Sequence, residues 1–366
     1  MVPPSPSSLP PINPRVPPSP PAAPPPLPPS DPRGVLKTHK TGAGSVGFNV
    51  LHRFGEGRGL RFALPHHYQF RKIPRNLQGR KGEGLQRGGG PIRHHLPPHE
   101  VRRVMPPDSF YFSIARDPAA AAESALSYYR SSVPAFRRAP SRSAFLLTPW
   151  LYYQPGLKGN HYARNLLWFD FGLPSISPSN MAAVAAAVRG LDAIFALVLL
   201  AEYFDESLVL LADALCWPLG AVVTFPHNGR PKGSVLRLGR GDMERLRQWN
   251  ALDWALYVHF NRSFWARVRR FGLARMEREV TRLRGLREQW AQRCLQGGGP
   301  LPAAAILDRN LKPFQPGQGA AAVMGYELRA DLGARDRETC ERMATPELQY
   351  KDRLHRRQFG PNATNG

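Results

Sequence analysis

Short apolar runs of strand length alternate with longer segments of helical spacing through most of this chain. The runs cover residues 35–36, 60–64, 109–115, 195–200 and 222–225. The clearest of them, SFYFSIA and FALVLL, are almost continuously apolar, which is typical of strands that are buried on both faces. We therefore predict an α/β fold with a central parallel sheet flanked by helices.

The helical segments lie between and after these runs. We predict helices over 119–130, 180–191 and 206–215, the first of them preceded by Pro118, which favours a first turn. From Asp242 to about Cys294, helical spacing continues with dense Arg and Glu. Its charges do not sustain a heptad seam, so we interpret them as a solvated face rather than a coiled coil or a nucleic-acid arm. Its apolar face is supplied by Trp249, Leu252, Tyr257, Phe260 and Trp265.

Two stretches lack such periodicity. Residues 1–34 hold 16 of the 39 prolines, which predicts a disordered, polyproline-prone tail before one domain over 35–360. Residues 66–100 contain RKGEGLQRGGGP and are predicted to form a long irregular loop. No run of about 18 apolar residues and no apolar signal-peptide core are present, so neither a membrane span nor a signal peptide is expected in this sequence.

The formal net charge of +23 indicates an anionic partner. Nucleic acid is the general interpretation of so basic a chain, but the charge is spread over many segments and no zinc-finger spacing or RNP motif occurs. We therefore expect no nucleic-acid partner. A polyanionic nucleotide cofactor, or a glycan in an acidic compartment, fits the charge as well.

The three cysteines lack the pairwise spacing of a metal site, and no metal is expected. Cys294 and Cys340 lie in polar segments and could be bridged in an oxidising lumen. Cys216 lies in LADALCWPL and is predicted to be buried. Two glycosylation sequons, which begin at Asn261 and Asn362, are compatible with a luminal protein.

The sequence VLKTHKTGAGSVGFNVL joins the first apolar run to a segment with helical spacing through a loop of small residues. Such a loop presents unpaired N–H groups and the positive end of a helix dipole to an anion. Lys37 or Lys40 can add a charge, and Thr41 and Ser45 can add hydroxyl donors. The loop is not a Walker A motif, because Lys40 precedes the glycines. This order, and the lack of a clear Walker-B aspartate, disfavour a kinase or another P-loop NTPase.

A second set of polar residues follows the next buried run, in SIARDPAAAAESALSYYRSS. Arg116 ends the predicted strand, and Ser124 lies eight residues further along. Because the carboxyl ends of parallel strands share one edge of a sheet, Lys40 and Arg116 are predicted to lie close together. A lysine at one strand end and an Arg and Ser at the next resemble the two phosphosulfate-binding halves of sulfotransferases.

Longer segments narrow this resemblance. From about residue 35 to 359 the chain resembles the galactose-3-O-sulfotransferase family, in segments such as ALPHHYQF, VMPPDSFYFSIARDP, HYARNLLWFDFGLP and WNALDWALYVHFNRSFW. The resemblance implies a P-loop NTPase-like sulfotransferase fold. It also implies transfer of a sulfuryl group from 3′-phosphoadenosine 5′-phosphosulfate (PAPS) to the 3-hydroxyl of terminal β-galactose on glycoprotein glycans or galactosylceramide-type glycolipids. Members are Golgi membrane proteins with a type II signal anchor and a luminal catalytic domain.

The resemblance also implies roles for individual residues. The 5′-phosphosulfate would be held by Lys40, Thr41, Gly42, Ala43, Gly44 and Ser45. Arg116 and Ser124 would hold the 3′-phosphate, and Lys40 would also neutralise charge during transfer. The family has a general-base histidine just before an Arg-Phe pair; here His95 matches best and His94 second, without the Arg-Phe pair.

Five other polar or aromatic residues lie near these motifs in the sequence or in similar polar segments. His39 is expected to shape the loop backbone, and Glu202 and Glu206 are expected to be structural charges. Asn165 and Trp168 could line a galactose site, although core packing is the expected role of Trp168.

The irregular region over 66–100 and the lack of an anchor leave one alternative open. The chain could be a catalytically impaired isoform that still binds glycan or nucleotide. Binding of adenosine 3′,5′-bisphosphate (PAP) without turnover would identify such an isoform.

Overall fold

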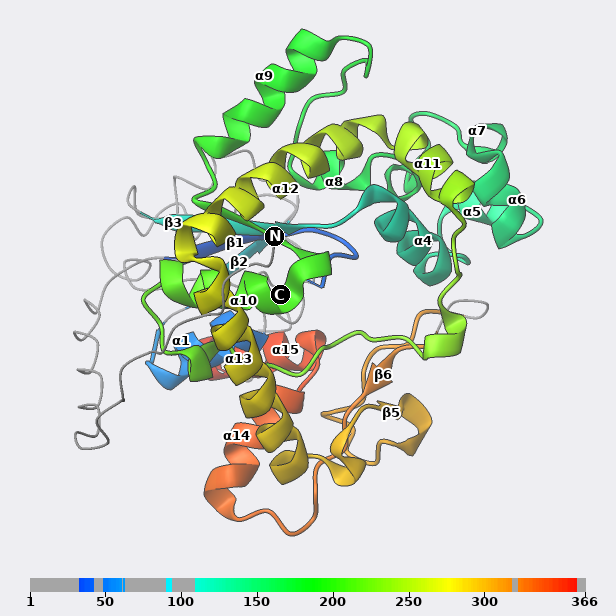
Figure 1. The fold of residues 1–366 in the computed structure, drawn as a ribbon. Coiled ribbons are helices and arrows are strands. Elements are labelled where there is room, and N and C mark those ends of the chain that lie inside the picture. The colour runs from blue at the N-terminus through cyan, green and yellow to red at the C-terminus, as the bar shows by residue number, and fades with distance from the viewer. Residues whose placement is uncertain are drawn as a thin grey trace, which may run out of the picture.

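The computed structural model describes residues 33–42, 49–60, 62, 90–93, 109–317 and 322–360 (Figure 1). Most of the predicted tail and of the long loop lie outside these residues, as do Ala43, Gly44, Ser45, His94 and His95. The described part is built around one sheet of four parallel strands in the order β2-β1-β3-β4. The strands are β1 (Arg33–Lys37), β2 (Gly90–Arg93), β3 (Phe110–Ala115) and β4 (Leu197–Leu200).

Helices cover both faces of this sheet, as the apolar runs predict. In Figure 1, α8, α9 and α12 lie above the sheet, and α1, α10 and α15 lie below it. The helices of the first half are α1 (Arg53–Gly57), α4 (Pro118–Tyr128), α5 (Pro134–Arg138), α6 (Arg142–Leu147), α7 (Pro149–Tyr152), α8 (Leu166–Asp170) and α9 (Met181–Asp192). Those of the second half are α10 (Phe204–Ala214), α11 (Arg240–Trp249), α12 (Ala251–Phe271), α13 (Leu273–Cys294), α14 (Ala334–Ala344) and α15 (Glu347–Phe359). A small antiparallel pair is formed by β5 (Leu301–Pro302) and β6 (Met324–Gly325).

The strands at the centre of the sheet confirm the parallel sheet. Val35 of β1 pairs with Phe112 of β3, and Ile114 of β3 pairs with Leu199 of β4; all four side chains are buried. β2 corrects the prediction of an irregular loop over 66–100. Its GPIR sequence contains a proline, which an edge strand tolerates because only one side of it needs ladder hydrogen bonds.

Two other strand predictions are wrong. In the run over 60–64, Leu60 and Phe62 are described and neither is in a strand. Instead, the backbone N–H and carbonyl of Phe62 bond to the side chain of Gln358. The run over 222–225 forms no strand either, because Arg53 donates to the Val223 carbonyl and Arg287 to the Thr224 carbonyl. Side chains thus satisfy the backbone groups that a sheet would otherwise pair.

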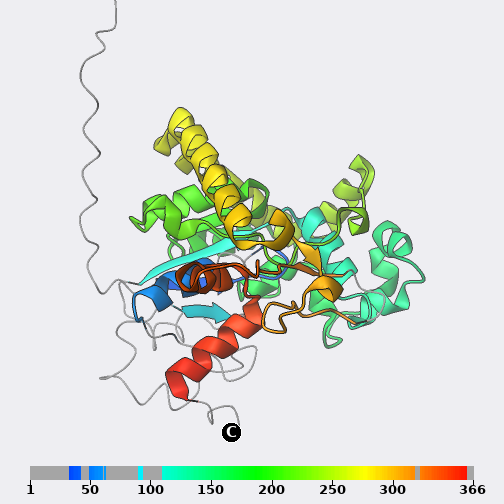
Figure 2. The ribbon, with the colours of Figure 1, turned by 90° about the horizontal axis from the view of Figure 1, so that it is seen from below.

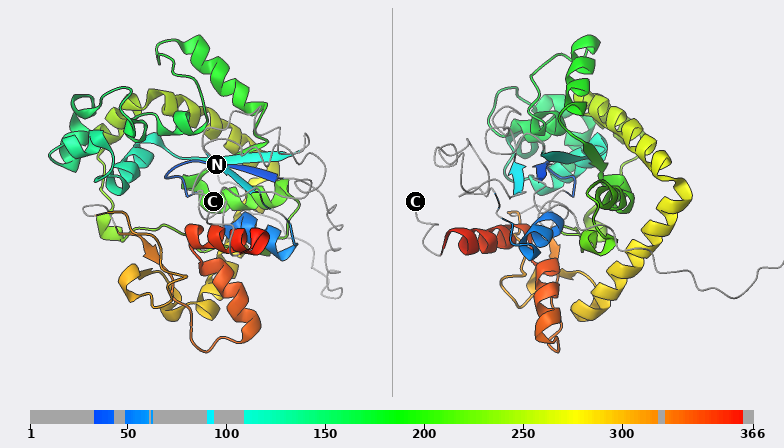
Figure 3. Two further views of the ribbon diagram at one scale, coloured as in Figure 1. Left: turned by 180° about the vertical axis from the view of Figure 1, so that it is seen from behind. Right: turned by 90° about the vertical axis from the view of Figure 1, so that its left-hand side faces the viewer.

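The stretch of helical spacing from Asp242 to about Cys294 is covered by three helices, α11, α12 and α13. α11 ends at Trp249, and α12 ends at Phe271, just before Gly272, whose φ of 97° is in the region that favours glycine. α12 and α13 form an elbow that stands out from the body in Figure 3. On the predicted apolar face, Leu252, Tyr257 and Phe260 are buried.

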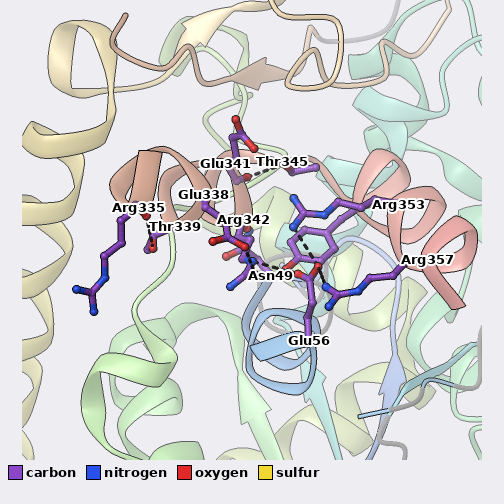
Figure 4. A network of polar contacts seen from close by, with 11 residues as sticks. Asn49, Glu56, Arg335, Glu338, Thr339, Glu341, Arg342, Thr345, Arg353 and Arg357 are labelled. Carbon is purple, nitrogen blue, oxygen red and sulfur yellow. Dashed lines mark hydrogen bonds and ion pairs between the residues drawn. The ribbon is translucent and has the colours of Figure 1, made fainter. Parts of the chain in front are cut away.

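The C-terminal helices are fastened to the rest of the chain in two ways. A disulfide joins Cys294, at the end of α13, to Cys340 of α14 and settles the pairing that the sequence leaves open. A buried carboxylate, Glu56 of α1, accepts hydrogen bonds from the Tyr350 hydroxyl at 2.8 Å, from Arg353 at 3.0 Å and from Arg357 at 2.9 Å (Figure 4). α15 therefore lies beside α1 on the underside of the molecule (Figure 2).

Two surface predictions change in the structure. Cys216 is exposed rather than buried, since it follows the end of α10 in a turn with φ 51°, and the next residue, Trp217, takes the buried position. Asn261, which begins the first sequon, lies inside α12 and is only partly exposed. Glycosylation usually takes place on surface loops, so this position is a poor acceptor.

Candidate active site

The loop after β1 forms a tight turn that is closed by its own threonines. The hydroxyls of Thr38 and Thr41 lie 2.8 Å apart, and the Thr41 hydroxyl also donates to the Thr38 carbonyl at 3.2 Å. Lys40 and Gly42 both have positive φ, 58° and 77°. For a lysine this left-handed backbone costs about 1–2 kcal/mol, so the surroundings must hold the loop in place.

Arg116 is one residue that holds it. It follows β3, and its Nη1 donates to the Lys40 carbonyl at 2.8 Å. The contact confirms the predicted juxtaposition of Lys40 and Arg116 at one edge of the parallel sheet, where β1 and β3 are neighbours. The two halves of the candidate anion site are therefore joined by a direct hydrogen bond.

Ser124, the residue predicted to bind the 3′-phosphate together with Arg116, is buried on α4. α4 begins after Asp117, whose carboxylate accepts from the Ala119 N–H at 2.8 Å, with Pro118 at the first helical position as predicted. Asp117 is held in turn by Arg247 at 2.6 Å. Arg116 therefore lies just before the capped start of α4, and Ser124 lies two turns further along the same helix.

Arg230 is a member of this site that the sequence analysis missed. Its guanidinium binds the carboxylate of Glu123, next to Ser124, in a bidentate pair at 3.0 and 2.6 Å. The pair is almost fully buried, with side-chain exposures of 9% and 4%. Arg230 lies in the segment NGRPKGS, which is typical of a turn. Such a segment does not indicate which distant residue its arginine contacts.

The charges of these residues act on one another. The pKa of Lys40 is lowered to about 7, first by burial and then by the positive charges of Arg230, Arg116 and Lys37; Glu123 opposes the shift. Burial also lowers the pKa of Arg116. Lys37 itself is paired with Glu347 of α15. Glu123 acts on all three cations, Lys40, Arg116 and Arg230, and Glu202 and Asp117 also act on Arg116. A polyanion would relieve the mutual repulsion of the three cations.

His39 lies beside this cationic group. Asp170, buried at the end of α8, accepts from the His39 backbone N–H at 2.6 Å and lies 2.8 Å from its ring Nδ1. The backbone bond confirms the expected role in shaping the loop. The second bond adds a histidine–carboxylate pair next to Lys40 that the sequence analysis did not anticipate. His95, the predicted base, lies outside the described residues.

The remaining candidates have structural partners. Trp168 is buried and donates from its indole to the Pro174 carbonyl at 2.8 Å, which confirms core packing. At the start of α8, the Asn165 backbone N–H donates to the side-chain oxygen of Asn250 at 2.8 Å. Glu202 accepts from the Asp117 N–H at 2.8 Å, and Glu206 lies in the first turn of α10, so both have the structural roles expected of them.

Within the ranges that the structure describes, no helix is both long and apolar enough to cross a bilayer. In the same ranges, no cluster of three or more His, Cys, Asp or Glu side chains could hold a metal ion.

Comparison with known proteins gives one consistent result. The sequence model of a family described as Galactose-3-O-sulfotransferase matches residues 4–358. The chain is 45% identical to the Bos taurus protein named Galactose-3-O-sulfotransferase 4, over 90% of this chain and 83% of the relative. The Homo sapiens protein of that name is 44% identical with the same coverage. The Bos taurus Galactosylceramide sulfotransferase is 40% identical over 86% of this chain and 76% of the relative.

Proposed function

The chain belongs to the galactose-3-O-sulfotransferase family and is a sulfotransferase, and we propose that it transfers a sulfuryl group from PAPS to the 3-hydroxyl of terminal β-galactose. The acceptors would be glycoprotein glycans or galactosylceramide-type glycolipids, as the names of the relatives suggest. The observation that carries the donor assignment is the hydrogen bond from Arg116 to the Lys40 carbonyl, which brings two anion-binding elements together.

The described residues fit a ligand with two separate anionic groups. The loop from Lys40 onward would hold the 5′-phosphosulfate, and Arg116 with Ser124 would hold the 3′-phosphate. Arg230 lies close enough to depress the pKa of both Lys40 and Arg116, so its charge would act on both groups. Its planar guanidinium and that of Arg116 suit phosphate oxygens better than an ammonium does.

When bound, PAPS supplies an activated sulfuryl group attached to a good leaving phosphate. Lys40 would donate to the oxygen on which negative charge grows as the sulfur–oxygen bond breaks. A cation that is fixed in place and partly desolvated stabilises such a charge more than a solvated one does. A dianionic ligand would also raise the pKa of Lys40 and keep its ammonium protonated near neutral pH.

The acceptor hydroxyl needs a base to take its proton. His95 stays a prediction from the family resemblance, and the geometry adds His39. The contact of its Nδ1 with Asp170 favours the tautomer in which Nδ1 carries the proton, which makes Nε2 the ring nitrogen that would accept one. The carboxylate would also stabilise the imidazolium that forms.

We place the protein in the lumen of the Golgi apparatus, attached to its membrane, by analogy with the family. The disulfide between Cys294 and Cys340 supports an oxidising compartment.

The test is mass-spectrometric detection of sulfate transfer from PAPS to a Galβ1-3GalNAc glycoside. We expect transfer by the wild type and a loss of at least 100-fold in Lys40→Ala, in line with removal of one oxyanion donor. Lys312→Ala, which changes an exposed lysine, is the matched control. The transfer rates of His39→Ala and His95→Ala, compared at saturating PAPS, would tell which histidine is the base. Tight PAP binding with no transfer by the wild type would instead favour the catalytically impaired isoform.

A further inference from the structure

Exposed hydrophobic side chains gather in one short part of the chain. The described residues include ten large hydrophobic side chains that are exposed, and four of these lie between residues 147 and 157. Leu147 ends α6, Trp150 and Leu151 lie in α7, and Leu157 follows α7. A cluster of this kind marks a surface that contacts a partner, whereas exposed apolar residues that stand singly need no such explanation.

The segments around this cluster carry positive charges and no carboxylate. Residues 124–169 contain six Lys or Arg and no Asp or Glu, although the whole chain has 27 Asp and Glu. The six cationic residues are Arg130, Arg137, Arg138, Arg142, Lys158 and Arg164. α11 packs against α6, but its Asp242 and Glu244 accept hydrogen bonds from residues of their own helix. Positive charge therefore dominates here and favours an anionic partner.

Helices α5, α6 and α7 lie together at one end of the molecule (Figure 1 and Figure 3, left). Phe145 and Leu146 of α6 and Pro149 of α7 are buried, so these helices turn their other side chains outward. The six outward residues that are exposed and either cationic or large and apolar form what we call the basic apolar surface. They are Arg137, Arg138, Leu147, Trp150, Leu151 and Lys158.

Hydrogen bonds hold this surface in place relative to the candidate active site. The buried side chain of Asn160 accepts from the Ala135 N–H at 2.9 Å and donates to the Gln154 carbonyl at 2.9 Å, and Arg138 donates to the Gln154 side chain at 2.9 Å. These bonds tie α5 to the segment that follows α7. α5 in turn follows α4, which begins two residues after Arg116. The surface and the donor-binding residues are therefore parts of one continuous support.

We propose that the basic apolar surface docks on an anionic lipid bilayer. The indole of Trp150 suits the boundary between water and lipid because it is amphipathic. The guanidinium groups of Arg137 and Arg138 can reach headgroup phosphates while their alkyl stems stay among apolar groups. Leu147 and Leu151 would enter the outer part of the acyl region. Such docking combines burial of apolar area with attraction to anionic lipids, and this surface offers both.

A protein partner is a second kind of occupant to consider. Protein interfaces usually hold their anchor residues in well-packed pockets. Trp150 is 56% and Leu151 68% exposed, so these side chains stand out from the surface rather than line a groove. A bilayer accepts such side chains without a pocket of matching shape. A second copy of this chain would also bring the same cations face to face in a two-fold pair, which like-charge repulsion disfavours.

The proposal goes beyond the proposed function and does not depend on it, because lipid binding is measured without sulfate transfer. The two are related in their consequence. Galactosylceramide-type acceptors lie in a bilayer, and docking through α5–α7 would bring that bilayer to the same support that holds Arg116.

The experiment is co-sedimentation of the full chain with vesicles of phosphatidylcholine and phosphatidylserine in a ratio of about 3:1. We expect the double variant Trp150→Ser/Leu151→Ser to weaken binding about tenfold or more, because apolar burial is lost. Arg137→Glu/Arg138→Glu should also weaken it about tenfold or more, and this part of the binding should decrease in about 0.5 M NaCl. The Kd of both variants for PAP should stay within about twofold of the wild type, which checks that they fold.

Matched controls make the same changes on other exposed residues. Leu307→Ser/Phe314→Ser removes two hydrophobic side chains that are 84% and 59% exposed. Arg269→Glu/Arg270→Glu reverses two neighbouring exposed arginines near the end of α12. Because the net charge of +23 attracts the whole chain to anionic vesicles, we expect these controls to weaken binding, but by no more than about threefold.

Quenching of tryptophan fluorescence by brominated lipid gives a second readout. Trp150→Leu keeps the apolar area and should still bind the vesicles, but it should lose most of the quenching seen in the wild type. Equal binding by the surface variants and their controls, or quenching that persists in Trp150→Leu, would overturn the proposal. Self-association of the wild type that Trp150→Ser/Leu151→Ser abolishes would overturn it in favour of a second copy. Vesicle binding that depends on Trp150, in a protein that transfers no sulfate, would support the docking surface and reject the proposed function.

Discussion

The depressed pKa of Lys40 leads to a quantitative prediction for donor binding. With a pKa of about 7 in the free protein, half of the Lys40 side chains are neutral at pH 7 and nearly all are neutral at pH 9. Only the ammonium form favours a phosphosulfate or phosphate group. Binding above pH 7 must therefore take up a proton, and affinity must fall as the pH rises.

The size of the effect follows from linkage. If the bound phosphate raises the pKa of Lys40 above 9, the Kd is proportional to 1 + 10^(pH − 7). Between pH 7 and pH 9 the Kd for PAP should then rise about 50-fold, which corresponds to about 2.3 kcal/mol. Below pH 7 the Kd changes by no more than about twofold through Lys40. The second ionisation of a phosphate, near pH 6, lies outside the chosen range.

Isothermal titration calorimetry with PAP can measure both the affinity and the proton uptake, in two buffers of different ionisation enthalpy. We expect an uptake of about half a proton at pH 7 and about one at pH 9. Lys40→Arg keeps its charge over this range and should show a flat Kd, whereas Lys312→Ala should keep the wild-type slope. A wild-type Kd that stays constant from pH 7 to 9 without proton uptake would refute the placement of the Lys40 ammonium at the phosphate.

Three further predictions follow from contacts around the site. Arg230→Gln should weaken PAP binding at least tenfold and move the pH break above 7, because the charge of Arg230 helps to lower the pKa of Lys40; calorimetry over the same pH range checks this. Glu56→Gln should lower the free energy of unfolding in urea by about 3 kcal/mol, since it leaves several arginines around a neutral amide, and an unchanged midpoint would contradict this. Replacing Cys294 and Cys340 by serine opens a loop of 46 residues and should cost about 4 kcal/mol, whereas Cys216→Ser should leave the urea midpoint unchanged.

The correct predictions of the fold and the site came from local sequence patterns and from one general rule about parallel sheets. Continuous apolar runs identified β3 and β4, and Asp117 followed by Pro118 marked the start of α4. The rule that parallel strands end at a common edge placed Lys40 near Arg116, 76 residues away. An apolar run predicts a strand wrongly where side chains, rather than a neighbouring strand, bond to its backbone carbonyls. Arg53 and Arg287 do this for the run over 222–225.

The missed residues share a different physical cause. Arg230 reaches Glu123 across 107 positions, and His39 reaches Asp170 across 131, through loops whose course no periodicity encodes. An isolated Arg or His in a polar loop has the same local pattern whether it is solvated or paired. Only the folded geometry separates the two, because a buried charge must have a partner whereas a surface charge need not.

The distribution of carboxylates in the structure suggests how such a basic chain tolerates its cationic site. Outside the group of Lys40, Arg116 and Arg230, other cations have carboxylate partners within the protein. Lys37 pairs with Glu347, and several arginines pair with Glu56. Within it, Lys40, Arg116 and Arg230 lie around Glu123, and burial together with the charges of the two arginines lowers the pKa of Lys40. A further carboxylate there would stabilise the empty protein but would also compete with the donor. The repulsion among these cations is therefore relieved most when an anion binds, which makes donor binding and the stability of this region depend on each other.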